Sequence, residues 1–259
     1  MPLTGKTIVI TRDVKQAEPF SSQLTRLGTN VILFPTIKIV GPDEPEKIRA
    51  GLEDISHYSW IVFTSANAVS YFFKFVFRNE VDFKRINIAC VGKKTAEVLG
   101  DFNLSPTLIP NKFSAQDIFE AMRKYDIKGK HILIPVSNLA AHEIENELQA
   151  LGAIVKRVEL YQTKTYKNPD TEMLHQKISD NLIDCVTFFS PSALNAFIQL
   201  MGEEVINEIN SNQIAIAVIG STTAKAAEEV RLKLIIQPMQ SDSESFLQAL
   251  KEYYSDSQN

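Results

Sequence analysis

The stretch FTSANAV at residues 63–69 returns as FFSPSAL at residues 188–194, about 125 positions further along the chain. In each copy a short apolar run leads to a serine, and residues with helical spacing follow. This is the pattern of a strand, a turn and a helix. A unit of this kind that occurs twice predicts a duplicated α/β fold.

Two further blocks repeat at nearly the same spacing. GKTIVI at residues 5–10 matches GKHILI at residues 129–134, and VGKKTA at residues 91–96 matches IGSTTA at residues 219–224. Blocks that repeat in the same order indicate that each copy spans nearly half of the chain. With 259 residues, 44% of them hydrophobic, the chain is long enough for two packed domains.

Apolar runs alternate with amphipathic helical patterns along both copies. Residues 7–11 and 30–34 are predicted strands around a helix at residues 16–27, with Gly28 as its C-cap. Such βαβ units form parallel sheets. Further strands are predicted at residues 60–64, 87–91, 107–109, 131–135, 154–160, 184–189, 214–219 and 234–236. Further helices are predicted at residues 67–77, 94–99, 115–123 with Ser114 at its start, 140–151 with Gly152 as C-cap, 192–200, 222–230 and 243–254.

Two stretches interrupt this alternation at equivalent places in the two copies, residues 36–45 and 161–170. Ordinary loops are one explanation. We favour a pair of extended linkers, because each domain would otherwise end within a sheet-forming run. On this interpretation residues 1–35 and 171–259 form one discontinuous α/β domain, and residues 46–160 form the other.

The composition limits the classes of function. No apolar run is long enough to cross a bilayer, and the chain begins directly with a predicted strand, so we expect a cytoplasmic protein without a signal peptide. A net charge of −4 argues against a general nucleic-acid binder. Cys90 and Cys185 lie in apolar runs and the four histidines lack metal-ligand spacing, so we expect no disulfide framework and no metal.

Small polar residues gather where the predicted strands end. In parallel sheets ligands bind beyond these ends, where helix N-termini favour an anion. Ser, Thr and Asn are also preferred as plain helix caps, so each turn alone has a structural explanation. All the turns together favour anion binding in a cleft between the domains. The candidate binding residues are Thr11, Arg12, Ser65, Ala66, Asn67, Gly92, Lys93, Thr95, Asn138, Ser190, Pro191, Ser192, Gly220, Ser221, Thr222 and Thr223.

Known catalytic fingerprints are missing from these turns. The sequence contains no G-x-G-x-x-G, no glycine-rich loop that ends in Gly-Lys-Ser/Thr, and no G-x-S-x-G nucleophile elbow. Carboxylates such as Glu143, Glu145 and Glu147 lie in charged helix patterns, which are typical of a solvated face. The predicted site is therefore poor in acids and bases and rich in neutral hydrogen-bond donors.

The order and spacing of these blocks resemble the uroporphyrinogen-III synthase family over nearly the whole chain. The resemblance rests on Thr11-Arg12 with Gln16 and Phe20, on Tyr161-Gln162-Thr163, and on the blocks at residues 63–69, 91–96, 188–192 and 219–224. It implies two Rossmann-like or flavodoxin-like α/β domains with parallel sheets flanked by helices, joined by a two-stranded β linker. It also implies a lyase that cyclises hydroxymethylbilane, a linear tetrapyrrole, to uroporphyrinogen III without metal or organic cofactor. Water is lost and the last pyrrole ring is inverted through a spiro intermediate.

The implied chemistry suits the predicted turns. The substrate bears many carboxylates, and helix N-termini bind carboxylates without a strongly basic surface. Folding the linear chain so that its terminal ring attacks the substituted carbon is catalysis mainly by orientation. Tyr161 matches the family's tyrosine that assists departure of the hydroxyl as water. The alternative for Tyr161 is a packed tyrosine whose hydroxyl is satisfied.

The turn after residues 131–135 departs from the family pattern. Family members often carry a basic residue and a glycine there, and an arginine on the next helix. This chain has Val136-Ser137-Asn138, and its helix offers His142, which puts a carboxylate contact at Asn138 in doubt.

The expected partner is the linear tetrapyrrole, with hand-over from hydroxymethylbilane synthase as one route of supply. We expect a monomer, with no nucleic acid and no membrane as partner. Two alternatives stay open at this point: a two-domain cytoplasmic binding module that closes on a small anionic ligand, and an enzyme for another anionic metabolite.

Overall fold

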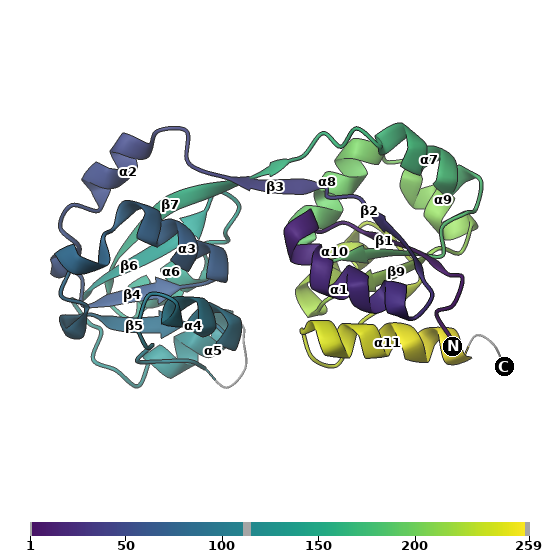
Figure 1. Ribbon diagram of the computed structural model, residues 1–259. Helices are drawn as coiled ribbons and strands as arrows, with labels where there is room; N and C mark the ends of the chain where they lie inside the picture. Colours follow the sequence, from purple (N-terminus) through teal and green to yellow (C-terminus); the bar gives the residue numbers. More distant parts are fainter. Residues whose placement is uncertain (1, 111–114, 257–259) are drawn as a thin grey trace. The chain divides into compact units, whose positions relative to one another are not determined.

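The computed structural model describes the backbone of residues 2–110 and 115–256, which fold as two compact units. Unit 1 is Met1–Lys38 with Lys164–Asn259, and unit 2 is Ile39–Thr163. Within the described residues, each unit holds one five-stranded sheet with helices on its faces (Figure 1). The predicted α/β class with parallel sheets flanked by helices is confirmed.

Unit 1 has the sheet order β10-β9-β8-β1-β2, and neighbouring strands are parallel. Its strands are β1 Thr7–Ile10, β2 Asn30–Leu33, β8 Cys185–Phe188, β9 Ala215–Val218 and β10 Ile235–Ile236. Its helices are α1 Val14–Arg26, α7 Thr171–Ser179, α8 Pro191–Met201, α9 Val205–Ser211, α10 Ser221–Glu229 and α11 Ser243–Asp256. Alternation along β1 separates two cores: Val9 packs with α7 to α10, and Ile8 packs with α1 and α11.

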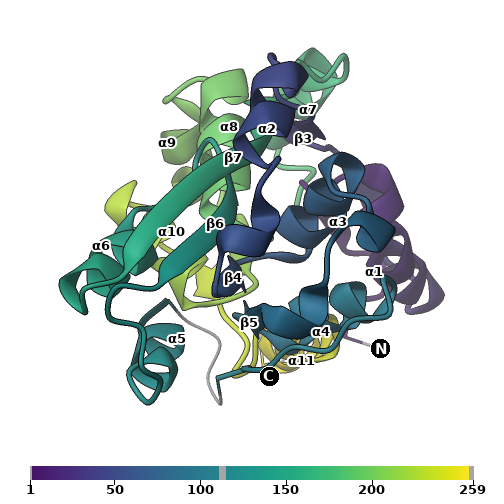
Figure 2. The same cartoon turned by 90° about the vertical axis from the view of Figure 1, so that its left-hand side faces the viewer.

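Unit 2 has the sheet order β3-β7-β6-β4-β5. Its strands are β3 Ile37–Val40, β4 Trp60–Phe63, β5 Asn87–Cys90, β6 His131–Ser137 and β7 Ile154–Thr165. Its helices are α2 Pro45–Gly51, α3 Ala66–Phe75, α4 Lys93–Gly100, α5 Ala115–Met122 and α6 Glu143–Ala150, with single 3₁₀ turns η1 Ile55–His57, η2 Arg78–Glu80 and η3 Phe83–Arg85. Figure 2 shows α3 and α4 on one side of the strands and α5 and α6 on the other, which matches two separate cores.

The duplication is visible in the strand order. In unit 1 the order β9-β8-β1-β2 corresponds to β5-β4-β6-β7 in unit 2. The registers agree as well, since Thr7 of β1 pairs with Asn30 and His131 of β6 pairs with Ile154. Gly28 and Gly152 follow the ends of α1 and α6 with φ of 80° and 84°, so both predicted C-caps adopt the left-handed region that favours glycine.

Three predicted elements differ from the structure by three residues or more. The strand expected at residues 107–109 is a single bridge between Leu108 and Ala89, because Pro106 and Pro110 on either side lack the N–H that a longer ladder needs. The helix expected from residue 140 begins at Glu143, after a turn closed by Ala140 N–H and the Ser137 carbonyl. The strand expected to end at residue 160 continues to Thr165, into the predicted linker.

The chain changes unit at Lys38–Ile39 in β3 and at Thr163–Lys164 in β7. These two strands are neighbours in the sheet of unit 2. Ser114, the expected start of α5, lies outside the described residues. None of the described helices combines the length and the apolar character that a bilayer crossing requires.

Candidate functional site

The parallel strands bring the predicted site residues together in two sets, one on each unit. In unit 1, β1, β8 and β9 are adjacent, so Arg12, Ser190 and Gly220 follow strand ends at one edge of the sheet. In unit 2, β6, β4 and β5 are adjacent, so Asn138, Ser65 and Gly92 follow strand ends at the corresponding edge. Carboxyl edges of parallel sheets are where α/β proteins bind ligands.

Ser190 and Gly220 start two helices at the edge of unit 1. The Ser190 hydroxyl accepts the Ala193 N–H at 3.2 Å and lies 3.0 Å from the hydroxyl of Ser192. Pro191 is the first residue of α8, where a missing N–H costs nothing. A side chain at Gly220 would meet the Ser241 hydroxyl, which would have to turn away.

Arg12 supplies positive charge at the same edge. Its guanidinium lies 4.9 Å from the centre of the Phe189 ring, and its Nε donates to Gln16 at 3.1 Å. Burial lowers the Arg12 pKa, with Asp13 opposing the shift, yet arginine stays charged at neutral pH. Arg12 is therefore a cation held against Phe189 at this edge of the sheet.

Three of the predicted threonines have buried side chains. Thr11 is fully buried and donates its hydroxyl to the Thr187 carbonyl at 2.7 Å. Thr95 and Thr223 are 6% and 3% exposed at the starts of α4 and α10. The structure thus gives these side chains an internal role, whereas Ser221, Thr222 and Lys93 are exposed.

Ser65 and Tyr161 form the centre of the edge of unit 2. The Ser65 hydroxyl caps α3 by accepting the Ala68 N–H at 3.1 Å, and it lies 3.0 Å from the Tyr161 hydroxyl. The cap occupies one of the two lone pairs of the Ser65 hydroxyl, so in the pair with Tyr161 either hydroxyl can donate. Ala66 and Asn67, in the first turn of α3, are half-buried next to this pair.

Tyr161 itself is buried on β7 and stacks on Tyr71, with ring centres 5.1 Å apart. Burial raises the pKa of Tyr161, and hydrogen bonds from the side chains of Ser65 and Ser137 oppose that rise only in part. Tyr161 therefore stays protonated at neutral pH and can act as a proton donor rather than as a base.

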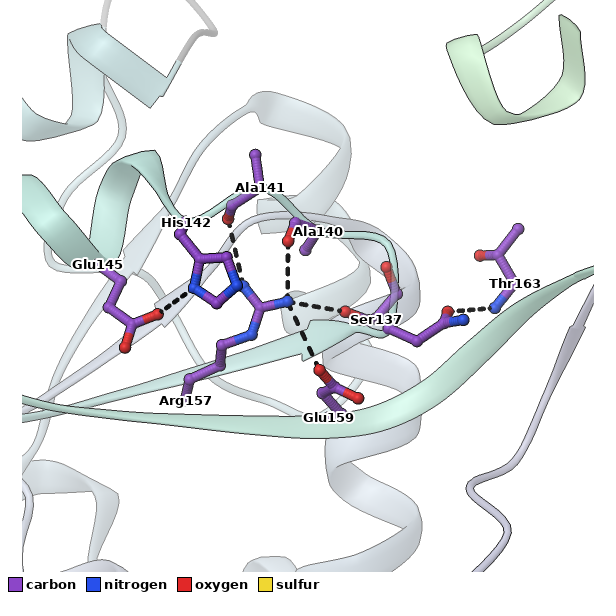
Figure 3. A network of polar contacts seen from close by, with 9 residues as sticks. Ser137, Ala140, Ala141, His142, Glu145, Arg157, Glu159 and Thr163 are labelled. Atoms are coloured by element: carbon purple, nitrogen blue, oxygen red, sulfur yellow. Dashed lines mark hydrogen bonds and ion pairs between the residues drawn. The ribbon is translucent and has the colours of Figure 1, made fainter. Parts of the chain in front are cut away.

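The turn of Asn138 is bound to β7. Its N–H donates to the Tyr161 carbonyl at 3.3 Å, and its side-chain oxygen accepts the Thr163 N–H at 2.8 Å. Arg157, a residue that the sequence analysis missed, reaches the same turn from β7 (Figure 3). No sequence signal marks Arg157, because it is one polar residue in an alternating strand.

A pocket of about 210 Å³ opens beside this edge. It is lined by Thr64, Val91, Ile134, Val136, Ala140, Ala141, Glu143, Ile144, Glu145 and Arg157. This volume is below the range that encloses a drug-sized ligand, so the pocket could hold a substituent but not a tetrapyrrole. Within the described ranges, no cluster of three or more His, Cys, Asp or Glu side chains could hold a metal ion.

Comparison with known proteins gives a consistent result. The model of the family described as uroporphyrinogen-III synthase HemD matches residues 18–248. The uroporphyrinogen-III synthase of Chlorobaculum parvum is 28% identical over 253 residues, which cover 95% of this chain and 98% of the relative. The uroporphyrinogen-III synthase of Synechococcus elongatus is 28% identical over 258 residues, with 97% of each chain covered.

Solved structures share the fold. A mutant uroporphyrinogen III synthase from Thermus thermophilus superposes with a TM-score of 0.70 at 15% identity, over 97% of this chain and all of that one. The uroporphyrinogen-III synthetase of Helicobacter pylori gives a TM-score of 0.61 at 16% identity, over 96% and 99% of the two chains. The two-unit α/β architecture is therefore common to all three proteins.

Proposed function

The chain belongs to the uroporphyrinogen-III synthase family, and from this premise we propose how its residues carry out the reaction. Its activity is that of a cyclising lyase of tetrapyrrole biosynthesis. We propose that the substrate is hydroxymethylbilane, which loses water and closes with inversion of its last pyrrole ring. This membership sets aside the binding module and the enzyme for an unrelated anion.

The observation that carries the proposal is the pair of Tyr161 and Ser65. Tyr161 gives its proton to the hydroxyl of the substrate's hydroxymethyl group, the carbon–oxygen bond breaks, and water leaves. The pyrrole nitrogen stabilises the remaining carbocation, while hydroxyl donation from Ser65 and Ser137 stabilises the phenolate. The proton lost from the attacking ring restores Tyr161, so the reaction releases water and nothing else.

The remaining edge residues bind and orient. Exposed groups such as Ser221, Thr222 and Lys93, together with Arg12, hold acetate and propionate carboxylates through charge-assisted hydrogen bonds. Fixing several carboxylates brings the terminal ring to the carbocation, and orientation of this kind contributes up to about 7–11 kcal/mol in favourable cases. Residues 36–45 and 161–170 are proposed as linkers between two domains. One domain comprises residues 1–35 and 171–259, and the other comprises residues 46–160.

The direct test supplies freshly made hydroxymethylbilane and resolves the oxidised products as isomers. We expect the type III isomer to dominate. Formation of type I alone, which is the spontaneous ring-closure product, would contradict the proposed function. The cytoplasmic location, the monomeric state and the hand-over from hydroxymethylbilane synthase stay predictions. Light scattering tests the monomeric state.

Tyr161→Phe tests the proton donor. We expect kcat to fall by at least about tenfold with KM nearly unchanged, because general acid catalysis is lost while the ring and its packing remain. The matched control is Tyr254→Phe, which removes another buried hydroxyl, one that donates to the Asp184 carbonyl at 2.9 Å. Turnover of the control should equal that of the wild type. Equal turnover of Tyr161→Phe, with normal thermal melting, removes Tyr161 from the mechanism.

A further inference from the structure

The Arg157 guanidinium binds the turn between β6 and α6 through hydrogen bonds to its backbone carbonyls. Its Nη2 donates to the carbonyls of Ala140 and Ser137 at 2.8 and 3.3 Å, and its Nη1 donates to the carbonyl of Ala141 at 3.2 Å. Figure 3 shows the side chain rising from β7 into the turn, with these carbonyls directed at it. The guanidinium thus fixes three peptide planes at once.

The surroundings of Arg157 are costly for a charged group. Its side chain is 12% exposed, and its Nε is buried without a hydrogen-bond partner among the described residues. The Glu159 carboxylate is 3.7 Å away on a side chain that is 53% exposed, so it compensates the charge weakly. A buried guanidinium in such surroundings is retained at a cost in desolvation, and its hydrogen bonds to the turn offset that cost.

The turn that Arg157 binds is paired with β7 at Tyr161. The β6–β7 register shifts between Val136 and Ser137, which leaves Leu160 as an extra residue and places Ser137 opposite Tyr161. The Asn138 N–H of the same turn donates to the Tyr161 carbonyl at 3.3 Å, and the Ser137 side chain opposes the rise that burial causes in the pKa of Tyr161. The turn therefore contacts Arg157 through the Ser137 carbonyl and the proposed proton donor through the pairing of Ser137 and the N–H of Asn138.

We propose that Arg157 is a positioning residue for the cyclisation, which holds the Ser137–Ala141 turn so that Ser137 stays opposite Tyr161. The inference rests on the proposed function, since it assigns Tyr161 the role of proton donor. An arginine suits this task because its planar fork reaches several carbonyls in fixed directions, whereas a lysine offers one flexible ammonium.

The test compares Arg157→Met, Arg157→Lys and the control Glu159→Gln. We expect kcat of Arg157→Met to fall roughly tenfold with KM within about twofold, because a small misplacement near the reacting atoms is costly. Arg157→Lys should retain more activity than Arg157→Met, since one donor is restored. Glu159→Gln should match the wild type, because it removes only the exposed carboxylate that compensates the guanidinium weakly. An equal fall in kcat for Glu159→Gln would overturn the proposal.

Two further measurements separate positioning from a general structural effect. The first is NMR of protein labelled at tyrosine Cζ, in which the Tyr161 signal is assigned by comparison with Tyr161→Phe. Arg157→Met should shift that signal and raise the pKa of Tyr161, because Ser137 is no longer held opposite Tyr161. The double variant Arg157→Met/Ser137→Ala should lose no more kcat than the larger single loss. An unchanged Tyr161 signal would contradict the positioning role of Arg157. A double variant whose loss of kcat equals the product of the two single losses would also contradict it. If Arg157→Met does not fold, Arg157→Lys gives the same readouts.

Failure of the Arg157 proposal can be distinguished from failure of the proposed function. Wild-type protein that forms only the type I isomer would refute the function, while the Tyr161 signal would still report whether Arg157 positions the tyrosine.

Discussion

Ser190 in unit 1 and Ser65 in unit 2 occupy the same place in the duplicated fold and use it differently. Each follows a strand and accepts the N–H of the residue three positions on, at 3.2 and 3.1 Å. Beyond the cap, the Ser190 hydroxyl meets Ser192, whereas the Ser65 hydroxyl meets Tyr161. The duplication thus supplies two equal caps, and the neighbouring strand determines which of them becomes part of a reactive pair.

The strands beside these caps explain the difference. In unit 1, β2 ends before Pro35, and the Thr36 hydroxyl donates to the Ala193 carbonyl in the first turn of α8 at 2.9 Å. In unit 2, β7 has no such proline and extends over 12 residues to Thr165, which brings Tyr161 to the cap of α3. Unit 1 therefore anchors its helix backbone, while unit 2 presents a neutral phenol.

The largest expected effect on stability concerns the residue just before β8 in unit 1, compared with the residue just before β4 in unit 2. Asp184 N–H donates to the Thr7 carbonyl as Ser59 N–H donates to the His131 carbonyl, so the positions correspond. The Asp184 carboxylate also accepts from Lys6 Nζ at 2.7 Å and from the Thr7 N–H at 2.8 Å. Asp184→Ala should lower the free energy of unfolding by about 2 kcal/mol, because it leaves that N–H unpaired.

Ser59→Ala is the matched change in unit 2. It should cost less than about 0.5 kcal/mol, because it removes no such carboxylate. Denaturant unfolding of both variants measures the difference. Equal losses would mean that the carboxylate of unit 1 adds nothing to the duplicated scaffold.

Ser65→Ala and Ser190→Ala sharpen the functional side of the comparison. Each should lower the free energy of unfolding by about 1 kcal/mol through loss of an N-cap. Ser65→Ala should also lower kcat about tenfold, because Tyr161 loses a donor that stabilises its phenolate. Ser190→Ala should change KM more than kcat, because it lies at the binding edge of unit 1. The steady-state parameters and thermal melts give the result, and a fall in kcat that is equal in both variants would contradict the asymmetry.

Much of the fold could be predicted because it follows from local chemistry. The apolar runs fix the strands, and the glycines at positive φ mark the helix ends at Gly28 and Gly152. The serines that follow strands also cap helices as expected, as at Ser65 and Ser190. These features depend on residues that are near one another in the sequence.

The rest depends on contacts between distant segments. A threonine suits a cap or a core equally, so the sequence did not show that Thr11 would donate to the Thr187 carbonyl. The register shift that places Ser137 opposite Tyr161 arises from pairing between two strands, and Arg157 reaches the turn only as a result of that pairing. The binding roles of the edge residues stay predictions.

The smallest expected effect concerns the buried thiols, Cys90 in unit 2 and Cys185 in unit 1. Burial raises the pKa of Cys90 to about 12, and it raises the pKa of Cys185 as well. Above about pH 9 the unfolded chain loses these protons while the folded chain keeps them, so the free energy of unfolding falls as pH rises.

Cys90→Ala should reduce the fall between pH 7.5 and pH 9.5 by about 1 kcal/mol, and Cys185→Ala should reduce it equally. Both thiols stay protonated in the folded chain over this window. Comparing the two pH values within each variant cancels the cost of the lost sulfur. Denaturant titrations at the two pH values measure the fall. If Cys90→Ala keeps the full wild-type fall while Cys185→Ala does not, the Cys90 thiol ionises normally and the strand ends of unit 2 are open to water.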